Sequence, residues 1–214
     1  MTPRAALERG AAELGIELRA DELERLLAYV TLMAKWNRTY NLTAVRDPLT
    51  IVSHHLLDSL AALPHLPTAG TGSIADAGSG AGLPGIPLAI ARPGWRMALA
   101  EANQKKAAFL RQATIELALR NVTVYEGRVE SWRPATPFAL VISRAFARLA
   151  QFAKACAHLV AGDGCLVAMK GVLRADELAE MGGWDCTTVE LRVPFLDAMR
   201  HLVILRRGAH TVAT

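Results

Sequence analysis

The stretch SIADAGSGAGLPG, residues 73–85, decides the fold expected for this chain of 214 residues. Its first five residues are mostly small or apolar, which is typical of a short buried strand. Four glycines follow, and glycine adopts a positive φ and lets a ligand approach the backbone closely. Pro84 suits the start of a helix, which we expect over residues 86–91. A strand, a glycine-rich loop and a helix in this order predict a Rossmann-like α/β domain.

The loop admits two interpretations, which differ in the charge of the ligand. Residues 80–85 fit the G-x-G-x-x-G pattern of dinucleotide sites, where a helix N-terminus meets a pyrophosphate. Alternatively, Asp76 stands two residues before Gly78, which resembles motif I of methyltransferases that use S-adenosylmethionine. That donor carries a sulfonium and an ammonium group and no phosphate, so a carboxylate at Asp76 favours it and repels a pyrophosphate. We therefore favour the methyl-donor interpretation.

Length and composition limit the classes of protein to consider. The length accommodates one α/β domain with a modest extension, and no apolar run is long enough to span a bilayer. Charged residues near the N-terminus, among them Arg4 and Glu8, argue against a signal peptide. Three cysteines without a C-x-x-C pair indicate reduced thiols, not disulfides or a zinc site. We expect a cytoplasmic protein that needs no metal.

The basic residues are concentrated in one part of the chain. Residues 1–72 hold 7 Lys and Arg against 8 Asp and Glu, whereas residues 73–214 hold 17 against 12. The excess of positive charge therefore belongs to the domain with the glycine loop. Such an excess is compatible with a polyanionic partner such as a nucleic acid.

The pattern of apolar residues predicts two parts that form one structural unit. Residues 1–72 are expected to be a helical extension packed on the core, with helices over 4–14, 21–36 and 48–63 and a linker containing Pro64, Pro67, Gly70 and Gly72. Residues 73–214 alternate between strands and helices, which predicts a mostly parallel sheet with helices on both faces. Strands are expected at 73–77, 95–101, 122–125, 138–142 and 165–169, and helices at 86–91, 103–119, 148–160 and 174–181. The segments 185–193 and 201–206 are expected to form an antiparallel pair at the sheet edge. The core face of the helix over 103–119 is expected to carry Ala107, Leu110, Ile115 and Leu119.

Ligands of such sheets bind beyond the carboxyl ends of the strands, so the residues just past each strand are the candidates. Glu101 ends the second strand, where a carboxylate accepts hydrogen bonds from both ribose hydroxyls. This role suits either interpretation of the loop. Arg128 and Lys170 follow later strands and are the candidates for binding RNA phosphates.

The segment after the fourth strand, residues 143–146, restricts the acceptor of the methyl group. Its sequence, SRAF, lacks the Asn/Asp-Pro-Pro-aromatic motif of enzymes that methylate exocyclic amines. Cys156 and Cys165 lack the proline-cysteine or threonine-cysteine setting of enzymes that attack a pyrimidine ring. Guanine N7 needs neither device, because it has a free lone pair and no proton to lose. Proximity and in-line alignment would then carry the catalysis.

Motifs along nearly the whole chain resemble the bacterial small-subunit rRNA guanine-N7 methyltransferases, also called glucose-inhibited division protein B. In chain order these are WN and NLT at 36–43, HLLDSL at 55–60, the glycine segment, KK and FL at 105–110, NV at 121–122, RVE at 128–130, SRA at 143–145 and KG at 170–171. The resemblance implies a Rossmann-like class I methyltransferase. It also implies transfer of a methyl group from S-adenosylmethionine to N7 of a guanosine in the 530 loop of 16S rRNA, with S-adenosylhomocysteine as product. The small ribosomal subunit or its assembly intermediate would be the partner.

The same resemblance implies which residues contact the donor. The backbone from Gly78 to Leu83, with Ser79 and Gly80, would hold the methionine end. Val129 and Glu130 would lie beside the adenine. Arg144 would pair with the donor carboxylate or with an RNA phosphate, and the residues leave both options open.

Other residues have structural as well as functional interpretations. His54, His55 and Asp58 lack a further ligand for a metal site, so we expect His55 and Asp58 to hydrogen-bond the extension onto the core. Trp36 and Tyr40 are expected to be buried anchors, although both could stack on bases. The competing functions are methylation of a small molecule, an NAD-linked oxidoreductase and a non-catalytic nucleotide-binding regulator.

Overall fold

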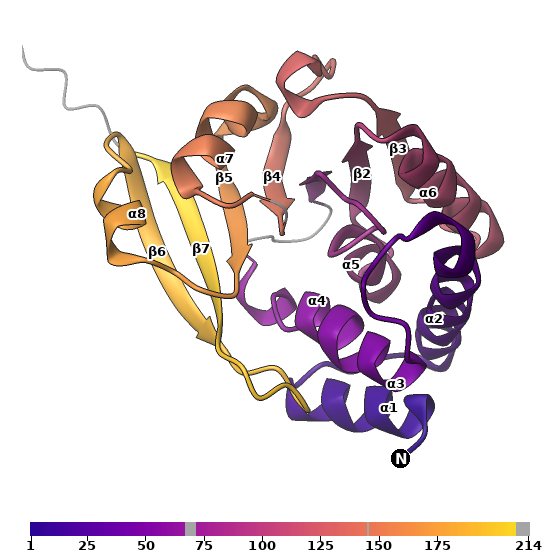
Figure 1. Cartoon of the computed structure of the whole chain (residues 1–214). Helices are drawn as coiled ribbons and strands as arrows, with labels where there is room; N and C mark the ends of the chain where they lie inside the picture. Colours follow the sequence, from indigo (N-terminus) through magenta and orange to yellow (C-terminus); the bar gives the residue numbers. More distant parts are fainter. Residues whose placement is uncertain (67–71, 145, 209–214) are drawn as a thin grey trace, which may run out of the picture.

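A seven-stranded sheet in the order β3-β2-β1-β4-β5-β7-β6 forms the centre of the molecule (Figure 1). The structure is a computed structural model that describes residues 1–66, 72–144 and 146–208. Strands β3, β2, β1, β4 and β5 pair in parallel, and β7 pairs antiparallel with both β5 and β6. The predicted mostly parallel sheet with an antiparallel edge is therefore confirmed. The strands are β1 (Ser73–Ala77), β2 (Arg96–Glu101), β3 (Val122–Glu126), β4 (Phe138–Ser143), β5 (Val160–Lys170), β6 (Trp184–Leu191) and β7 (Arg200–Arg207).

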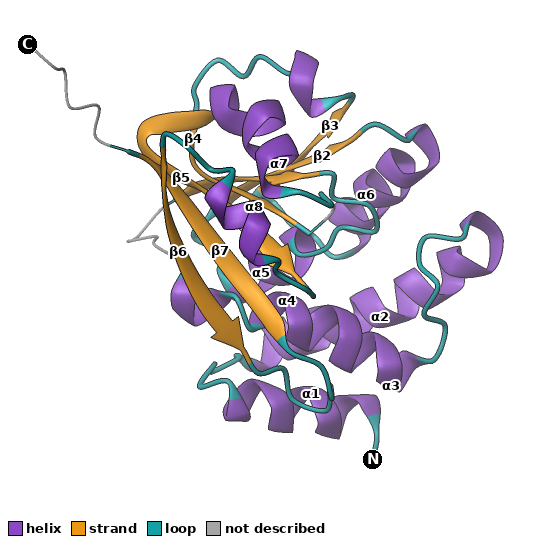
Figure 2. Cartoon of the chain, turned by 60° about the vertical axis from the view of Figure 1, so that its left-hand side comes forward, coloured by secondary structure: helices purple, strands orange, loops and turns teal. Residues whose placement is uncertain are grey.

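Helices cover both faces of this sheet (Figure 2). In the second half of the chain these are α5 (Gly85–Ala91), α6 (Gln104–Glu116), α7 (Leu149–Cys156) and α8 (Ala175–Ala179), with short 3₁₀ turns η3 (Val129–Ser131) and η4 (Ala157–Leu159). The N-terminal part consists of α1 (Pro3–Glu13), α2 (Ala20–Tyr40), α3 (Pro48–Ile51), the π-helix η1 (Val52–Leu57), α4 (Asp58–Leu60) and the 3₁₀ turn η2 (Leu63–His65). Helix α2 packs against α5 and α6, which seats the extension on one face of the sheet.

Side chains alternate between two cores, as the period of two in a strand requires. In β1, Ile74 belongs to the core shared with α5, α6 and the N-terminal helices, whereas Ala75 belongs to the core beneath α7. The same alternation holds in β4, where Leu140 and Val141 lie on opposite faces. Both faces of these strands are largely buried, so their sequences are mostly apolar.

The N-terminal helices differ from the prediction at two places. Helix α2 continues one turn past residue 36, to Tyr40, and ends at Asn41 with φ 48°. The buried Asn37 side chain fastens the chain that follows, because its Nδ2 donates to the Val45 carbonyl and its Oδ1 accepts from the Thr43 amide. The predicted single helix over 48–63 contains the π-helix η1. The Ser53 hydroxyl of η1 and the Ser59 hydroxyl of α4 each donate to a carbonyl of the preceding turn.

Two expectations within the second half of the chain are wrong in detail. Ile115 of α6 is 73% exposed, and the buried face of this helix includes Phe109 and Ala113. Residue 115 lies five positions after Leu110, which turns it away from the sheet. Strand β5 begins at Val160, five residues earlier than expected, with an irregularity in its pairing with β4. The linker positions Pro67 and Gly70 lie outside the described residues.

Candidate functional site

The glycine loop lies between β1 and α5 and requires glycine at several positions. Gly78, Gly80 and Gly82 have φ values of 74°, 58° and 89°, which disfavour other residues. A Cβ on Gly82 would lie 2.5 Å from Ile86 Cδ1, and one on Gly85 would lie 2.3 Å from Leu99 Cδ2. The amides of Gly78 and Ser79 both donate to the Ala100 carbonyl, at 3.0 and 2.9 Å. The loop is thus fixed against the end of β2.

Asp76 lies inside the protein beneath this loop and is not exposed at all. Its Oδ2 accepts from the Gly85 amide at 2.9 Å, and its Oδ1 has no hydrogen-bond partner among the described residues. Burial raises the pKa of this carboxyl from 3.8 to about 7, against the lowering effect of the Gly85 bond. That the Asp76 carboxylate favours a cationic donor stays a prediction, and its carboxyl lies beneath the loop and does not line the cavity. In this geometry Asp76 holds the loop and the start of α5 in place.

Glu101 connects the end of β2 to the glycine loop. Its Oε2 accepts from the Gly80 amide and its Oε1 from the Asn103 amide, each at 2.8 Å. Each carboxylate oxygen can accept a further bond, so these contacts leave acceptor capacity for a ligand. Asn103 in turn caps α6, because its Oδ1 accepts from the Lys105 and Lys106 amides.

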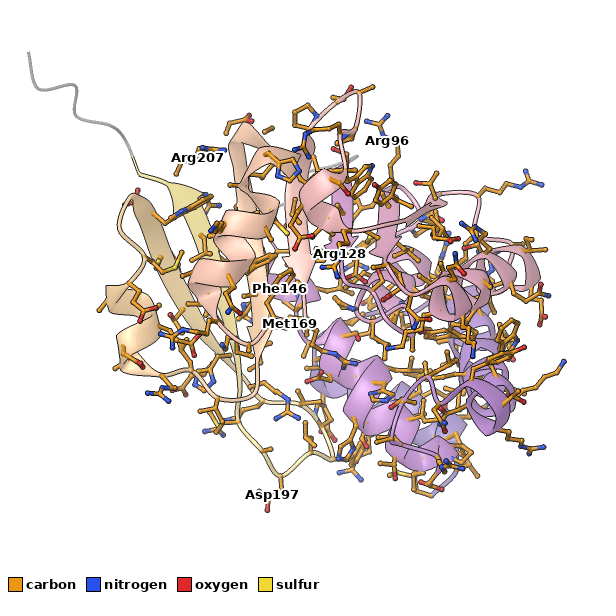
Figure 3. The ribbon with its side chains drawn as sticks, turned by 45° about the horizontal axis from the view of Figure 1, so that its top comes forward. Arg96, Arg128, Phe146, Met169, Asp197 and Arg207 are labelled. Atoms are coloured by element: carbon orange, nitrogen blue, oxygen red, sulfur yellow. The ribbon has the colours of Figure 1, made fainter. Side chains whose placement is uncertain are left out.

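A cavity of about 200 Å³ opens beside these residues, at the carboxyl ends of β1, β2 and β3. Five of the predicted site residues line it, and Phe146, which the sequence analysis did not assign to the site, lines it with Arg128 (Figure 3). The Phe146 ring packs on Phe152 of α7 at 5.3 Å between centroids. The position of Phe146 just past β4 is the feature of the sequence that could have assigned it to the site. The lining residues are Gly78, Ala100, Glu101, Ala102, Gly127, Arg128, Val129, Glu130 and Phe146.

The other predicted donor residues do not line this cavity. Ser79 and Leu83 are buried in the loop, and the Ser79 hydroxyl donates to the Asp76 carbonyl at 2.9 Å. Ala81 of the same loop accepts a hydrogen bond from the hydroxyl of the fully buried Tyr29 of α2. The N-terminal extension therefore contacts the glycine loop directly, through this hydrogen bond.

Arg144 binds the extension. Its Nη1 donates to Asp58 Oδ2 at 2.9 Å and to the His54 carbonyl at 3.3 Å. Arg200, which the sequence analysis did not single out, donates from Nε to Asp58 Oδ1 at 3.1 Å. Asp58 thus hydrogen-bonds the extension onto the core, as expected.

His55 has a different role from the one expected. Its Nε2 lies 2.7 Å from the Thr43 hydroxyl and its Nδ1 lies 2.9 Å from the His54 carbonyl, so both contacts stay within the extension. Burial, aided by the nearby Arg144 charge, lowers the pKa of His55 from 6.5 to about 4. His55 is therefore neutral near pH 7 and does not join the extension to the core.

The two RNA candidates differ sharply in their surroundings. The Arg128 side chain is exposed at the cavity and forms no ion pair with any described residue. Lys170 is buried, and its Nζ donates to Glu177 Oε2 at 2.6 Å and to the Ala147 carbonyl. The placement of Lys170 on an exposed rim is corrected, because its ammonium is already bound inside the protein.

The two aromatic residues of α2, Trp36 and Tyr40, differ in burial. Trp36 is half-buried and packs on Phe109 of α6 at 5.5 Å between ring centroids, as expected for an anchor. Tyr40 is 42% exposed and lies on Trp36 at 5.0 Å, so its placement as a buried anchor is wrong.

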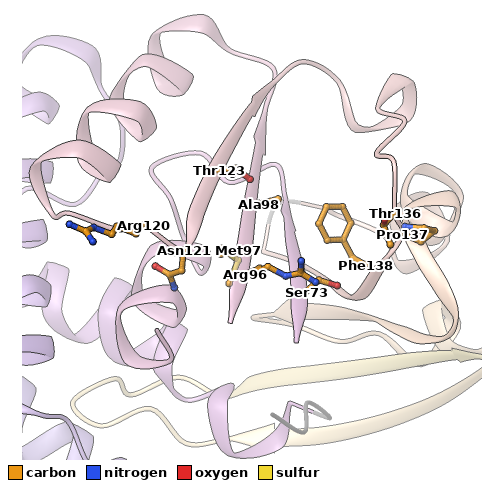
Figure 4. A pocket seen from close by; sticks show the side chains of 10 residues that line it. All are labelled: Ser73, Arg96, Met97, Ala98, Arg120, Asn121, Thr123, Thr136, Pro137 and Phe138. Atoms are coloured by element: carbon orange, nitrogen blue, oxygen red, sulfur yellow. The ribbon is translucent and has the colours of Figure 1, made fainter. Parts of the chain in front are cut away.

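A second cavity, of about 320 Å³, lies at the opposite edge of the sheet, where β1, β2 and β3 begin (Figure 4). Arg96, Arg120 and Phe138 are among its lining residues. This cavity lies at the amino ends of the strands, whereas the glycine loop lies at their carboxyl ends, so the length of a strand separates the two. None of the predicted site residues lines this cavity.

Among residues 1–66, 72–144 and 146–208, no three His, Cys, Asp or Glu side chains are grouped as metal ligands. Within the same ranges, no helix is both long enough and apolar enough to cross a membrane. The expectation that no metal is needed stays a prediction.

Solved structures that share this fold have low sequence identity to this chain. A complex of DhpI with SAH superimposes with a TM-score of 0.55 at 16% identity, covering 90% of this chain and 100% of that chain. TrmN from Thermus thermophilus superimposes with a TM-score of 0.56 at 14% identity, covering 80% of this chain and 53% of that one. These similarities confirm the class I methyltransferase fold.

Similarity in sequence is far more specific. A relative from Methylobacillus flagellatus named ribosomal RNA small subunit methyltransferase G is 52% identical over 93% of this chain and 96% of its own length. A relative of the same name from Nitrosospira multiformis is 50% identical over 97% of this chain and 99% of its own length. The profile of the family described as GidB, rRNA small subunit methyltransferase G, matches residues 22–203. This chain therefore belongs to the GidB family of small-subunit rRNA methyltransferases.

Proposed function

We propose that this methyltransferase transfers a methyl group from S-adenosylmethionine to N7 of a guanosine in the 530 loop of 16S rRNA. One observation carries the proposal: the cavity at the carboxyl ends of β1, β2 and β3 combines the glycine loop, Glu101 and the segment 128–130, in a chain of this family. Ligands of open α/β sheets bind at this edge.

The residues around the cavity fit the donor. The left-handed backbone at Gly78 and Gly80 exposes peptide groups without a Cβ, which suits the methionine end. Glu101 retains acceptor capacity for the ribose hydroxyls. Val129, which is buried, would pack on the adenine, and Glu130, which is exposed, would lie at its edge.

The chemistry asked of the protein is mainly positioning. S-adenosylmethionine, when bound, supplies a methyl group on a sulfonium, and guanine N7 offers a lone pair with no proton to remove. The described residues that line the cavity include neither histidine nor cysteine, so they offer no conventional base–nucleophile pair. Holding donor and acceptor in line is then the main contribution of the chain. S-adenosylhomocysteine would be the other product.

Positively charged side chains beside the cavity would bind the phosphates of the RNA that carries the acceptor guanosine. Arg128 at the cavity has no carboxylate partner among the described residues, which leaves its guanidinium available for a phosphate. Arg144 follows β4, the strand next to β1, and lies on the same edge. A small ribosomal subunit, or an intermediate in its assembly, is the partner we propose.

The test is transfer of a labelled methyl group to small ribosomal subunits that lack the modification, followed by chemical cleavage at 7-methylguanosine. We expect one cleavage, in the 530 loop. The Gly78→Asp variant, which adds a Cβ and a charge beside the cavity, should lose donor binding and transfer while remaining folded. Cleavage elsewhere, or transfer to subunits by the variant at the wild-type rate, would refute the assignment.

A further inference from the structure

The cations along the carboxyl edge of the sheet are not equivalent. Lys170 has the Glu177 carboxylate as a partner, and Arg174 has Asp176 at 3.0 Å. Arg148 is bound to Glu180. Arg148 also lies 4.0 Å from Asp176, so these three cations have three carboxylates among them and their charges are locally compensated.

Arg144 and Arg200 instead share a single carboxylate, that of Asp58. Asp58 Oδ2 accepts from Arg144 at 2.9 Å and its Oδ1 from Arg200 at 3.1 Å. The Asp58 side chain is 4% exposed, whereas the two arginines are 25% and 26% exposed. The group therefore carries one net positive charge, and this charge lies on the partly exposed guanidinium groups and not on the carboxylate.

Both guanidinium groups keep unused donors. Toward the described residues, Arg144 donates from Nη1 alone, and Arg200 donates from Nε to Asp58 and from Nη1 to the Met199 carbonyl. Arg144 Nε and Nη2 and Arg200 Nη2 bond no described residue. These donors suit a phosphate, which accepts charge-assisted hydrogen bonds from more than one guanidinium.

The three residues come from distant parts of the chain. Asp58 starts α4 in the extension, Arg144 follows β4, and Arg200 starts β7. The π-helix η1 ends at Leu57, and its His54 carbonyl accepts from the same Arg144 Nη1. Without the Asp58 carboxylate, two like charges would face each other across this junction and repel.

We propose that Asp58 is a positioning residue, which holds Arg144 and Arg200 side by side as one site for a phosphate of the RNA substrate. This inference rests on the proposed function and assigns a role to the N-terminal extension. Asp58 itself contacts no RNA, and it acts through the two arginines.

Asp58→Asn gives a test in which positioning and simple charge predict opposite results. The substitution adds one positive charge to this edge, so an effect of net charge alone would tighten RNA binding. If Asp58 positions the arginines, binding of a 16S rRNA transcript should weaken tenfold or more, and its dependence on salt should become shallower. Asp197→Asn is the matched control, because Asp197 is exposed in the turn before β7 and its loss adds the same charge (Figure 3). Equal or tighter RNA binding by Asp58→Asn would overturn the proposal.

Arg200→Gln tests the site without leaving Asp58 unpaired, since Arg144 remains. We expect the plot of log K for RNA binding against log salt concentration to become shallower, its slope decreasing in magnitude by about 0.7 to 0.9. Arg96→Gln, at the opposite edge of the sheet, removes the same charge and should leave the slope unchanged. Equal slopes for Arg200→Gln and wild type would refute the phosphate site, even if Asp58→Asn does not fold.

Thermal unfolding and binding of S-adenosylmethionine are measured for every variant. An Asp58→Asn protein that binds the donor as wild type does is folded, so its loss of RNA binding would support positioning. Failure of the proposed function appears separately, as wild-type protein that transfers no methyl group to small subunits. RNA binding by the variants does not depend on that result.

Discussion

Asp76 is an unusual residue, because its carboxylate is fully buried and only one of its oxygens has a partner among the described residues. A charged carboxylate is poorly stabilised there, which is why the pKa rises to about 7. The single bond to the Gly85 amide couples the side chain to the start of α5. The residue thus joins strand, loop and helix at one point.

This burial predicts a dependence of stability on pH. Between pH 4 and 7 the folded protein keeps a proton on Asp76 that the unfolded chain releases, so this group stabilises the fold at low pH and loses that effect as pH rises through 7. The free energy of unfolding should fall by up to about 1.4 kcal/mol per pH unit from this group alone. Asp76→Asn should abolish that contribution, measured as the difference from wild type in urea unfolding at several pH values.

The comparison with wild type is needed because His55 acts in the opposite direction. Its lowered pKa means that the unfolded chain binds the extra proton between pH 4 and 6.5, so His55 favours folding as pH rises. Asp163→Asn, at an exposed position of β5, is the control. An Asp76→Asn variant with the wild-type pH profile would contradict the assignment.

Glycines allow a second test, which separates backbone strain from steric contact. Gly82 has a φ of 89° and no room for a Cβ, Gly183 has a φ of 82° and open space, and Gly94 has open space and no positive φ. Alanine should destabilise by about 1 kcal/mol at Gly183, by about 2 to 4 kcal/mol at Gly82, and hardly at all at Gly94. Urea unfolding measures all three. Equal losses at Gly82 and Gly183 would show that the contact with Ile86 costs nothing.

At the scale of elements, the start of α6 is linked to the cavity. Asn103 caps the helix through its side chain, and its amide donates to Glu101, a cavity residue. Asn103→Ala should cost about 1 kcal/mol of stability, because two helix amides lose their acceptor. Donor affinity should fall less than it does for Glu101→Gln, since the Asn103 amide remains.

Asn103→Ser retains a capping oxygen and should keep most of that stability. Calorimetric unfolding distinguishes the two substitutions. An Asn103→Ala protein as stable as wild type would mean that solvent replaces the cap.

The extension shows how elements of the N-terminal part serve the core. Tyr29 of α2 reaches the glycine loop, and Asp58 of α4 reaches Arg144 and Arg200. Hydropathy correctly predicted that this part of the chain is helical. It did not predict the π-helix, where serine hydroxyls and a distant arginine donate to backbone carbonyls of this segment.

At the scale of the whole molecule, Arg128 and Lys170 should respond differently to substitution. Arg128→Gln should leave stability unchanged and reduce the salt slope of RNA binding by about 0.7 to 0.9, because an exposed cation is lost. Lys170→Met should cost about 3 to 5 kcal/mol, because Glu177 would be left buried without its partner. Filter binding at several salt concentrations and urea unfolding measure the two effects.

The double variant Lys170→Met, Glu177→Gln is the control for the buried pair. It should recover part of the lost stability, since no unpaired charge remains. A Lys170→Met protein of wild-type stability with a reduced salt slope would restore Lys170 to the RNA surface.

The sequence by itself determined the class of fold, the glycine loop, the position of Glu101 at the end of a strand, and the family. These features depend on local patterns, since a strand, a turn that needs positive φ and an amphipathic helix are each specified by residues close together in the chain. Only the tertiary structure decided which charged groups are available. Glu101 and Lys170 end their strands and Asp76 lies within its own, yet Asp76 and Lys170 are buried, whereas Glu101 lines the cavity. The sharing of Asp58 by Arg144 and Arg200, 86 and 142 residues away, depends on how the extension packs on the sheet. No local pattern encodes that packing.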